Sequence, residues 1–360
     1  GADVLAKSVT IHGYTGSTAQ AYAAQNGQTF AELGAIPAGQ TEPVVTDAAF
    51  TWEQSGSGIT ITGVTSETAL VGTLTIPGEY EGQKVLDVRL DYSAATGEEN
   101  FVSRLVISDG IQYLSGSFDG WDELQSVSIP GTVTWIGDGT FRECSGLADI
   151  TIGAGSPYTV SSGRILGDGG QKLVSWPAAS GDIVIPEGIA GIGEYVFNGK
   201  QITSVSLPES LSYIGRGAFM TCTSLKQVVF PSRLREIGGY AFSGAPLTAV
   251  ELPASVQTIG EGAFQRMSGA ALSVTVRNPY AVFGTQAFVG DFPAVPASAV
   301  TLHGYAGSTA EEYAGANGHG FTAELGAIPA AWAQVRAYIG ASIFSNIGAD
   351  AAADARQAVT

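Results

Sequence analysis

The histidines and cysteines of this chain are the first residues to consider as metal ligands or nucleophiles. The histidines are His12, His303 and His319, and the cysteines are Cys144 and Cys222. The sequence contains no Gly-x-Ser-x-Gly elbow, no His-Glu-x-x-His and no calcium-loop aspartate series, which are motifs that hold such groups at the spacing their chemistry needs. We therefore predict a protein that is not an enzyme, with no catalytic residue, no metal site and no cofactor.

Aromatic residues offer a different chemistry, which is binding. Tyr113, Trp135 and Tyr213 stand at the same place in three sequence repeats, just before an Ile-Gly pair or its equivalent. Tyr113 and Trp135 fall in neighbouring repeats, where their rings could form a contact patch for a protein or a carbohydrate, since such rings combine apolar area with a hydrogen-bonding tip. The alternative is that the rings stack on each other and on a nearby hairpin as ordinary sheet neighbours, because aromatic residues are common in strands.

The repeats that must position these residues extend over roughly residues 70–290. Strand-end residues Ile107, Ile129 and Ile152 lie 22 and 23 residues apart, and later units keep a similar interval except for one of 33 residues. The clearest units read as a strand closed by proline, then Ile-Gly-x-x-Ala-Phe, in which the glycine allows a tight corner. Ser108 and Gly153 replace the strand-end proline in two early units. A unit this small cannot bury its own apolar residues, so neighbouring coils must stack. The core should be a column of rings formed by Phe118, Phe141, Phe197, Phe219, Phe242, Phe264 and Phe288.

The clearest copy of the repeat is Ile214–Phe219, which reads IGRGAF and is followed by Cys222 and Leu225. This pattern resembles the BspA-type leucine-rich repeats of bacterial surface proteins, and a set of copies in register is specific where a single copy would be weak. The resemblance implies an α/β, strand-rich fold. It would be a right-handed leucine-rich-repeat solenoid with coils of about 22–24 residues, a capping hairpin and terminators that contain a helix. Ser115 departs from the pattern, since it replaces the corner glycine of the first unit.

Two near-duplicate segments, residues 9–37 and 300–329, stand on either side of the repeats. Each reads as a strand, a turn and a short helix that opens at Ser17 or Ser308. In the resembled family such a segment ends an array. A terminator ahead of the repeats, and a start at Gly1 without a methionine or a signal-peptide pattern, lead us to expect a piece of a longer protein or a removed leader. The predicted order is a terminator at 1–37, a linker at 38–48, a solenoid at 49–299 with a capping hairpin at 50–61 and a hairpin insert at 157–177, a terminator at 300–330 and a helical extension at 331–360.

The stacked repeats also keep the histidines and cysteines apart. His12 and His303 occupy equivalent places in the two terminators, and strands about 4.8 Å apart would separate them by roughly 40 Å, too far for one metal or catalytic site. Cys144 and Cys222 each follow a column phenylalanine by three residues, in coils at least two apart. A spacing on the order of 10 Å exceeds the reach of a disulfide, about 7 Å. We predict two free, buried thiols.

The charge of the chain excludes some classes of partner. The net charge is −17, from 33 acidic and 16 basic residues. Such a balance argues against nucleic acid or an anionic membrane as a partner, and an acidic surface that keeps a secreted protein in solution explains it simply. No apolar run approaches the length that spans a bilayer, so we expect no membrane insertion.

Two function classes remain. The first, which we adopt, is an interaction module on the bacterial cell surface or secreted from the cell, which binds a host or matrix protein or a glycan by its strand face, as the resemblance implies. The alternative is a structural spacer that holds another domain away from the cell wall and has no ligand of its own. Exposed aromatic residues clustered on one face would favour the module, and a uniformly polar surface would favour the spacer.

Overall fold

The structure is a computed structural model of the chain, and it describes residues 10–13, 29–32, 48–65, 70–90, 100–116, 118, 121–266, 271–289 and 295–332. The chain divides into two compact units, Gly1–Gly163 and Arg164–Thr360, and each unit is considered by itself. The predicted linker apart from Ala48, and the predicted extension beyond Trp332, lie outside the described residues. The domain boundaries inferred from the sequence stay a prediction.

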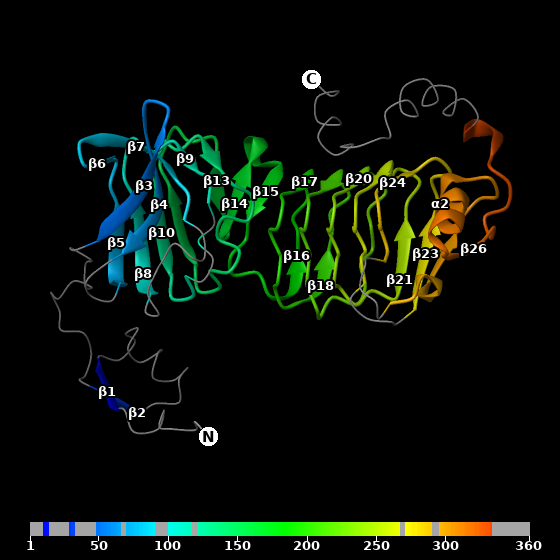
Figure 1. Cartoon of the computed structure of the whole chain (residues 1–360), viewed down its shortest axis with the longest axis horizontal. Coiled ribbons are helices and arrows are strands. Elements are labelled where there is room, and N and C mark those ends of the chain that lie inside the picture. Colours follow the sequence, from blue (N-terminus) through cyan, green and yellow to red (C-terminus); the bar gives the residue numbers. More distant parts are fainter. Residues whose placement is uncertain are drawn as a thin grey trace. The chain divides into compact units, whose positions relative to one another are not determined.

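The first unit stacks parallel strands in two columns (Figure 1). One column has the strand order β12-β10-β8-β5, and the other has the order β11-β9-β7-β4-β3. At the end of the second column, β3 and β4 form an antiparallel hairpin. The described strands of this unit are β1 (Thr10–Gly13), β2 (Thr29–Glu32), β3 (Ala49–Ser55), β4 (Gly58–Thr65), β5 (Leu70–Ile76), β6 (Glu79–Tyr80), β7 (Gln83–Val88), β8 (Asn100–Ile107), β9 (Tyr113–Leu114), β10 (Ser126–Ile129), β11 (Trp135–Ile136), β12 (Asp149–Ile152) and β13 (Thr159–Ser161).

The second unit has the same two-column plan and carries one described α-helix, α2 (Thr309–Asn317). Its short strands are β17 (Gly191–Ile192), β19 (Tyr213–Ile214), β20 (Glu236–Ile237), β22 (Thr258–Ile259) and β24 (Val282–Phe283), and they follow the antiparallel pair β14 (Arg164–Gly167) and β15 (Lys172–Ser175). Its longer strands are β16 (Gly181–Val184), β18 (Ile202–Ser206), β21 (Ala249–Leu252), β23 (Leu272–Val276), β25 (Val300–His303) and β26 (Gly320–Thr322). Three short 3₁₀ turns complete the described elements: η1 (Asp168–Gly170), η2 (Ala297–Ala299) and η3 (Ala330–Trp332).

Equivalent residues of successive coils lie directly opposite one another. Along the short strands of the second unit, the register partners in order are Ile192, Ile214, Ile237, Ile259 and Phe283. The residues of β21 alternate between exposed and buried, as a strand with one face on the core requires. The strand-rich leucine-rich-repeat solenoid that the sequence predicts is confirmed.

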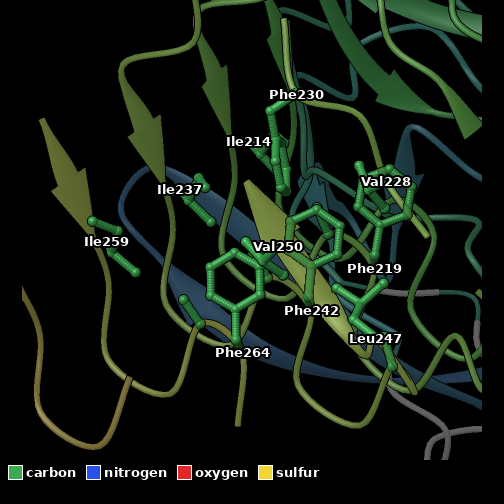
Figure 2. Packing of buried hydrophobic residues seen from close by; sticks show 14 of the residues in the cluster. Ile214, Phe219, Val228, Phe230, Ile237, Phe242, Leu247, Val250, Ile259 and Phe264 are labelled. Atoms are coloured by element: carbon green, nitrogen blue, oxygen red, sulfur yellow. The ribbon is translucent and has the colours of Figure 1, made fainter. Parts of the chain in front are cut away.

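The predicted column of phenylalanine rings is also confirmed within each unit. Every ring is at most 3% exposed, and each lies within 22° of parallel to the next. Figure 2 shows Phe219, Phe242 and Phe264 in a row beside the column isoleucines. Such stacking adds about 0.5–1.5 kcal/mol per pair beyond burial. The ring centroids lie 5.0 Å apart for Phe118–Phe141 in the first unit, and 4.9 Å for Phe197–Phe219, 5.1 Å for Phe219–Phe242, 5.3 Å for Phe242–Phe264 and 5.9 Å for Phe264–Phe288 in the second.

In the second unit, the glycines that follow Ile214 and Ile237 are required by the close approach of two coils. Gly215 and Gly238 do not have a positive φ, so a left-handed turn does not explain them. A Cβ at Gly215 would lie 2.7 Å from the carbonyl carbon of Gly193, and one at Gly238 would lie 2.7 Å from the backbone nitrogen of Arg216. The tight corner inferred from the sequence is therefore a place where stacked backbones leave no room for a side chain.

A cap built around α2 closes the last coils of the second unit. Ser308 accepts a hydrogen bond from the Glu311 N–H at the start of the helix, and Gly318 ends it with a φ of 70°. Tyr313 on the helix extends the aromatic core, because its ring stacks on Phe283 with centroids 4.8 Å apart. The buried rings of the array are thus covered by the helix rather than left open at the end.

Candidate binding surface

Tyr113 and Trp135 form an exposed pair on the short-strand column of the first unit. They are direct register partners on β9 and β11. Tyr113 is 41% exposed and Trp135 is 46% exposed, although large apolar groups on the surface are few in the described residues. The next residue of each strand, Leu114 or Ile136, is buried, and successive side chains of a strand point to opposite faces. Burial of these two aliphatic residues therefore fixes both rings on the outer face.

The rings of Tyr113 and Trp135 do not stack on each other in the part of the chain that the structure describes. The Trp135 ring lies over Gly137, where a Cβ would come within 3.3 Å of its Cη2 atom. Asp87 on β7 is the register partner of Tyr113, and its carboxylate accepts hydrogen bonds from the Ser115 N–H at 3.2 Å and the Ser115 hydroxyl at 2.6 Å. Within the described residues no ring contact joins Tyr113 to Trp135, so the pair presents two separate aromatic surfaces beside a carboxylate.

Tyr213 belongs to the second unit and has a different setting. It is the register partner of Gly191 on β17, and its ring occupies the space of the side chain that Gly191 lacks. A Cβ at Gly191 would lie 1.9 Å from Cζ of Tyr213. The ring is half-buried against the preceding coil. The Tyr213 side chain therefore fills the space beside Gly191 between two neighbouring strands. Tyr213 is not part of the exposed pair.

The structure shows a polar ladder that the sequence analysis missed. Arg216 Nε donates to the Tyr195 hydroxyl at 3.0 Å, and Cζ of Arg216 lies 4.7 Å from the ring centroid of Tyr240. The Tyr240 hydroxyl donates to Glu261 at 2.7 Å, and this hydrogen bond raises the pKa of Tyr240. Four residues from four successive coils are therefore linked along one line.

The two tyrosines of this ladder adopt a conformation that favours glycine. Tyr195 has a φ of 56° and Tyr240 a φ of 58°, and the equivalent residues in the following coils are Gly217 and Gly262, with φ of 59° and 57°. A left-handed conformation costs a residue other than glycine on the order of 1 kcal/mol. The alternation of Tyr and Gly two residues before Phe197, Phe219, Phe242 and Phe264 is visible in the sequence and was the signal that could have revealed this ladder.

A groove crosses the longer-strand column of the second unit. It has a volume of about 800 Å³ and is lined by residues of the segment 226–230 together with β21 and β23. The segment 226–230 is not part of a regular strand. The longer-strand column is therefore divided into two sheets, one of β16 and β18 and one of β21, β23, β25 and β26. Val229 in this segment is 75% exposed.

The side chains of His303, His319, Cys144 and Cys222 make structural contacts. His303 Nδ1 lies 2.6 Å from the Thr322 hydroxyl, and His319 Nδ1 lies 2.9 Å from the Ala297 carbonyl oxygen. Neither Cys144 nor Cys222 forms a disulfide and both are buried, as predicted, and burial raises the pKa of the Cys222 thiol to about 12. The side chain of His12 lies outside the described residues. In the described ranges, no group of three or more His, Cys, Asp or Glu residues is arranged to hold a metal ion. No helix there is long and apolar enough to cross a membrane.

Comparisons with known proteins relate the chain to one repeat family. The model of the BspA-type leucine-rich repeat region matches residues 100–162 and 181–291 in six copies. The chain is similar to the crystal structure of the pneumococcal vaccine antigen PcpA, with 14% identity over 79% of this chain and 98% of that chain and a TM-score of 0.39. It is also similar to a leucine-rich repeat protein from Bacteroides ovatus, with 18% identity, 72% and 70% coverage and a TM-score of 0.39. A leucine-rich cell surface protein from Faecalibacterium prausnitzii has 19% identity, 70% and 75% coverage and a TM-score of 0.33. No curated protein matches the chain.

Proposed function

The chain belongs to the BspA-type leucine-rich repeat family, and on that basis we propose that it is a non-enzymatic interaction module of a bacterial cell-surface or secreted protein. In this role the array binds a partner, a host or matrix protein or a glycan, by the outer face of its short strands. The array supplies a rigid surface on which side chains from successive coils stand in fixed rows, which is how repeat arrays present extended binding faces.

The observation that carries this proposal is the exposed pair of Tyr113 and Trp135. Both rings are held outward by buried neighbours, lie on adjacent strands and have no ring contact with each other within the described residues. A tryptophan and a tyrosine that are close together and exposed are the side chains most often found at the energetic centre of an interface. The Asp87 carboxylate beside Tyr113 adds a hydrogen-bond acceptor to the same row.

The test is an unbiased screen of the purified chain against arrays of glycans and extracellular-matrix proteins. For a partner found there, Tyr113→Ala/Trp135→Ala should weaken binding at least tenfold, about 1.4 kcal/mol or more, because the anchoring rings are removed. The matched control is Gln112→Ala/Thr134→Ala, which truncates the exposed residues next to the two rings and leaves the rings in place.

The outcomes of this screen separate the two function classes. Saturable binding that the aromatic double substitution abolishes and the control preserves would locate the binding surface. Binding that is equal in all three proteins would contradict the assignment to these rings. No binding on either array would favour the alternative, a structural spacer without a ligand of its own.

A further inference from the structure

A second groove lies on the second unit. It has a volume of about 580 Å³. Serine and arginine are the only residue types that line it, without any apolar side chain. The lining residues come from three successive coils and are Ser210, Ser212, Ser232, Arg233, Arg235 and Ser255.

The repeat itself explains why a hollow forms at this place. After each strand-end proline the chain carries two outward residues on either side of a buried aliphatic one. In one coil these residues are Arg233 and Arg235 around the buried Leu234. In the preceding coil the same two places hold Ser210 and Ser212, and in the following coil Ser255 takes the first of them. Short serines on both sides leave room beside the two long arginine side chains.

The groove contains hydrogen-bond donors that lack acceptors. In the described part of the chain, neither guanidinium group of Arg233 and Arg235 has an ion-pair or hydrogen-bond partner. The hydroxyl oxygen of Ser255 is buried and also has no partner there, whereas nearly all buried polar atoms in folded proteins have one. The carboxylate of Glu209, the residue before Ser210, accepts hydrogen bonds from the N–H of Ser232 at 3.2 Å and from its hydroxyl at 2.8 Å.

We propose that this groove binds an anionic group, a carboxylate or a sulfate, of an acidic polysaccharide. The two guanidinium groups, which come from one coil, match the planar pairs of oxygen atoms that carboxylates and sulfates present. The absence of any apolar lining residue, with hydroxyl groups on the walls, suits a sugar chain better than a peptide, whose side chains need apolar pockets. The chain has a net charge of −17, but these two arginines have no acidic partner. They therefore create a local positive potential that would attract an anion.

This site goes beyond the proposed function, because it lies in the other unit and takes a different ligand chemistry. The experiment uses the full chain and four probes: dextran sulfate, polygalacturonate, uncharged dextran and, as an acidic peptide, poly-glutamate. Binding of each is measured by biolayer interferometry at low and at physiological salt. We expect saturable binding of one or both acidic polysaccharides, and no binding of uncharged dextran. This binding should be weaker at higher salt, because exposed charges are screened. The acidic polymer that binds identifies sulfate or carboxylate as the preferred source of the anion.

The decisive variant is Arg233→Ser/Arg235→Ser, which installs the residues that the preceding coil carries at the same places. It should weaken binding of the acidic polymer at least about tenfold, the usual effect of losing a charge-assisted contact. The matched control is Lys226→Ser, which removes a positive charge from the same coil but outside this groove. An unchanged melting temperature of both variants shows that the array is intact.

Several results would overturn the proposal. Equal binding by the parent and the arginine variant would do so, as would an equal loss of binding with Lys226→Ser. Equal binding of uncharged dextran would also do so, and so would binding of poly-glutamate without binding of either acidic polysaccharide. The aromatic variant Tyr113→Ala/Trp135→Ala should still bind the acidic polymer. Failure of this site and failure of the aromatic surface are therefore distinguishable.

Discussion

The ring of Tyr195 occupies the space that a side chain on Gly217 would need, since a Cβ there would lie 2.4 Å from Cε1 of Tyr195. The same relationship recurs two coils later, where a Cβ on Gly262 would lie 2.6 Å from Cε1 of Tyr240. Each tyrosine of the polar ladder thus rests on the glycine of the following coil. The pairs couple neighbouring coils on the surface, as the phenylalanine column couples them in the core.

Gly217→Ala should destabilise the second unit for two reasons. The position has a φ of 59°, and the new methyl group collides with the Tyr195 ring. We expect a loss of about 2–3 kcal/mol in the free energy of unfolding, measured by urea denaturation. In a Tyr195→Ala background the collision is absent, so the same substitution should cost only about 1 kcal/mol. Equal costs in both backgrounds would contradict the ring contact.

Gly238 and Gly239 provide a matched test of the close approach between coils. A Cβ at Gly238 meets backbone atoms at 2.7 Å, whereas one at Gly239 first meets the flexible Arg216 guanidinium and the Glu261 carbonyl oxygen at 3.2 Å. Gly238→Ala should cost at least about 2 kcal/mol of unfolding free energy, and Gly239→Ala under about 1 kcal/mol. Thermal unfolding of the two variants compares them directly. A larger effect at Gly239 would show that backbone contact does not explain these glycines.

Phe219→Ala should remove a ring from the middle of the buried column. Its neighbours Phe197 and Phe242 stack on its two faces, at 4.9 and 5.1 Å, so the cavity has little means to collapse. The expected cost is about 3–5 kcal/mol of unfolding free energy. Val229→Ala serves as the control, because Val229 is 75% exposed and its truncation should change stability by under about 0.5 kcal/mol. A near-zero effect at Phe219 would refute the stacking.

Burial of Cys222 makes stability depend on alkaline pH. Burial raises the pKa of the folded thiol to about 12, whereas an exposed thiol in the unfolded chain ionises near about pH 8.5. The contribution of the thiol is therefore full below about pH 8.5 and is lost as the pH rises toward 12, by roughly 1.4 kcal/mol per pH unit. Urea denaturation at pH 7 and pH 10 should show a steeper loss for the parent than for Cys222→Ala. Identical pH profiles would contradict this linkage.

The repeat spacing made the fold predictable from the sequence. The binding site, in contrast, was largely not predictable from it. Column residues such as Ile214 and Phe219 recur at fixed intervals, so their burial and stacking could be deduced from pattern alone. The interpretation of Gly215 needed the structure, because contact with Gly193 in the preceding coil is invisible to a reading of local turns.

The binding residues show the same limit. Sequence placed Tyr113, Trp135 and Tyr213 in one class, since all three hold the same place in the repeat. The structure separates them, because Gly191 offers Tyr213 a space to fill, whereas Tyr113 and Trp135 are register partners on adjacent strands and both remain exposed. What a repeated position does depends on its neighbour one coil away, some 22 residues distant in the sequence.

The alternation of tyrosine and glycine sets a rule for how this array can change length. Loss of the single coil that carries Gly217 would bring the Tyr195 ring against the side chain of Tyr240, with no glycine between them. Loss of two adjacent coils would instead restore a tyrosine above a glycine. In this stretch, viable deletions and duplications should therefore comprise an even number of coils, so that the array is built from pairs rather than from single repeats.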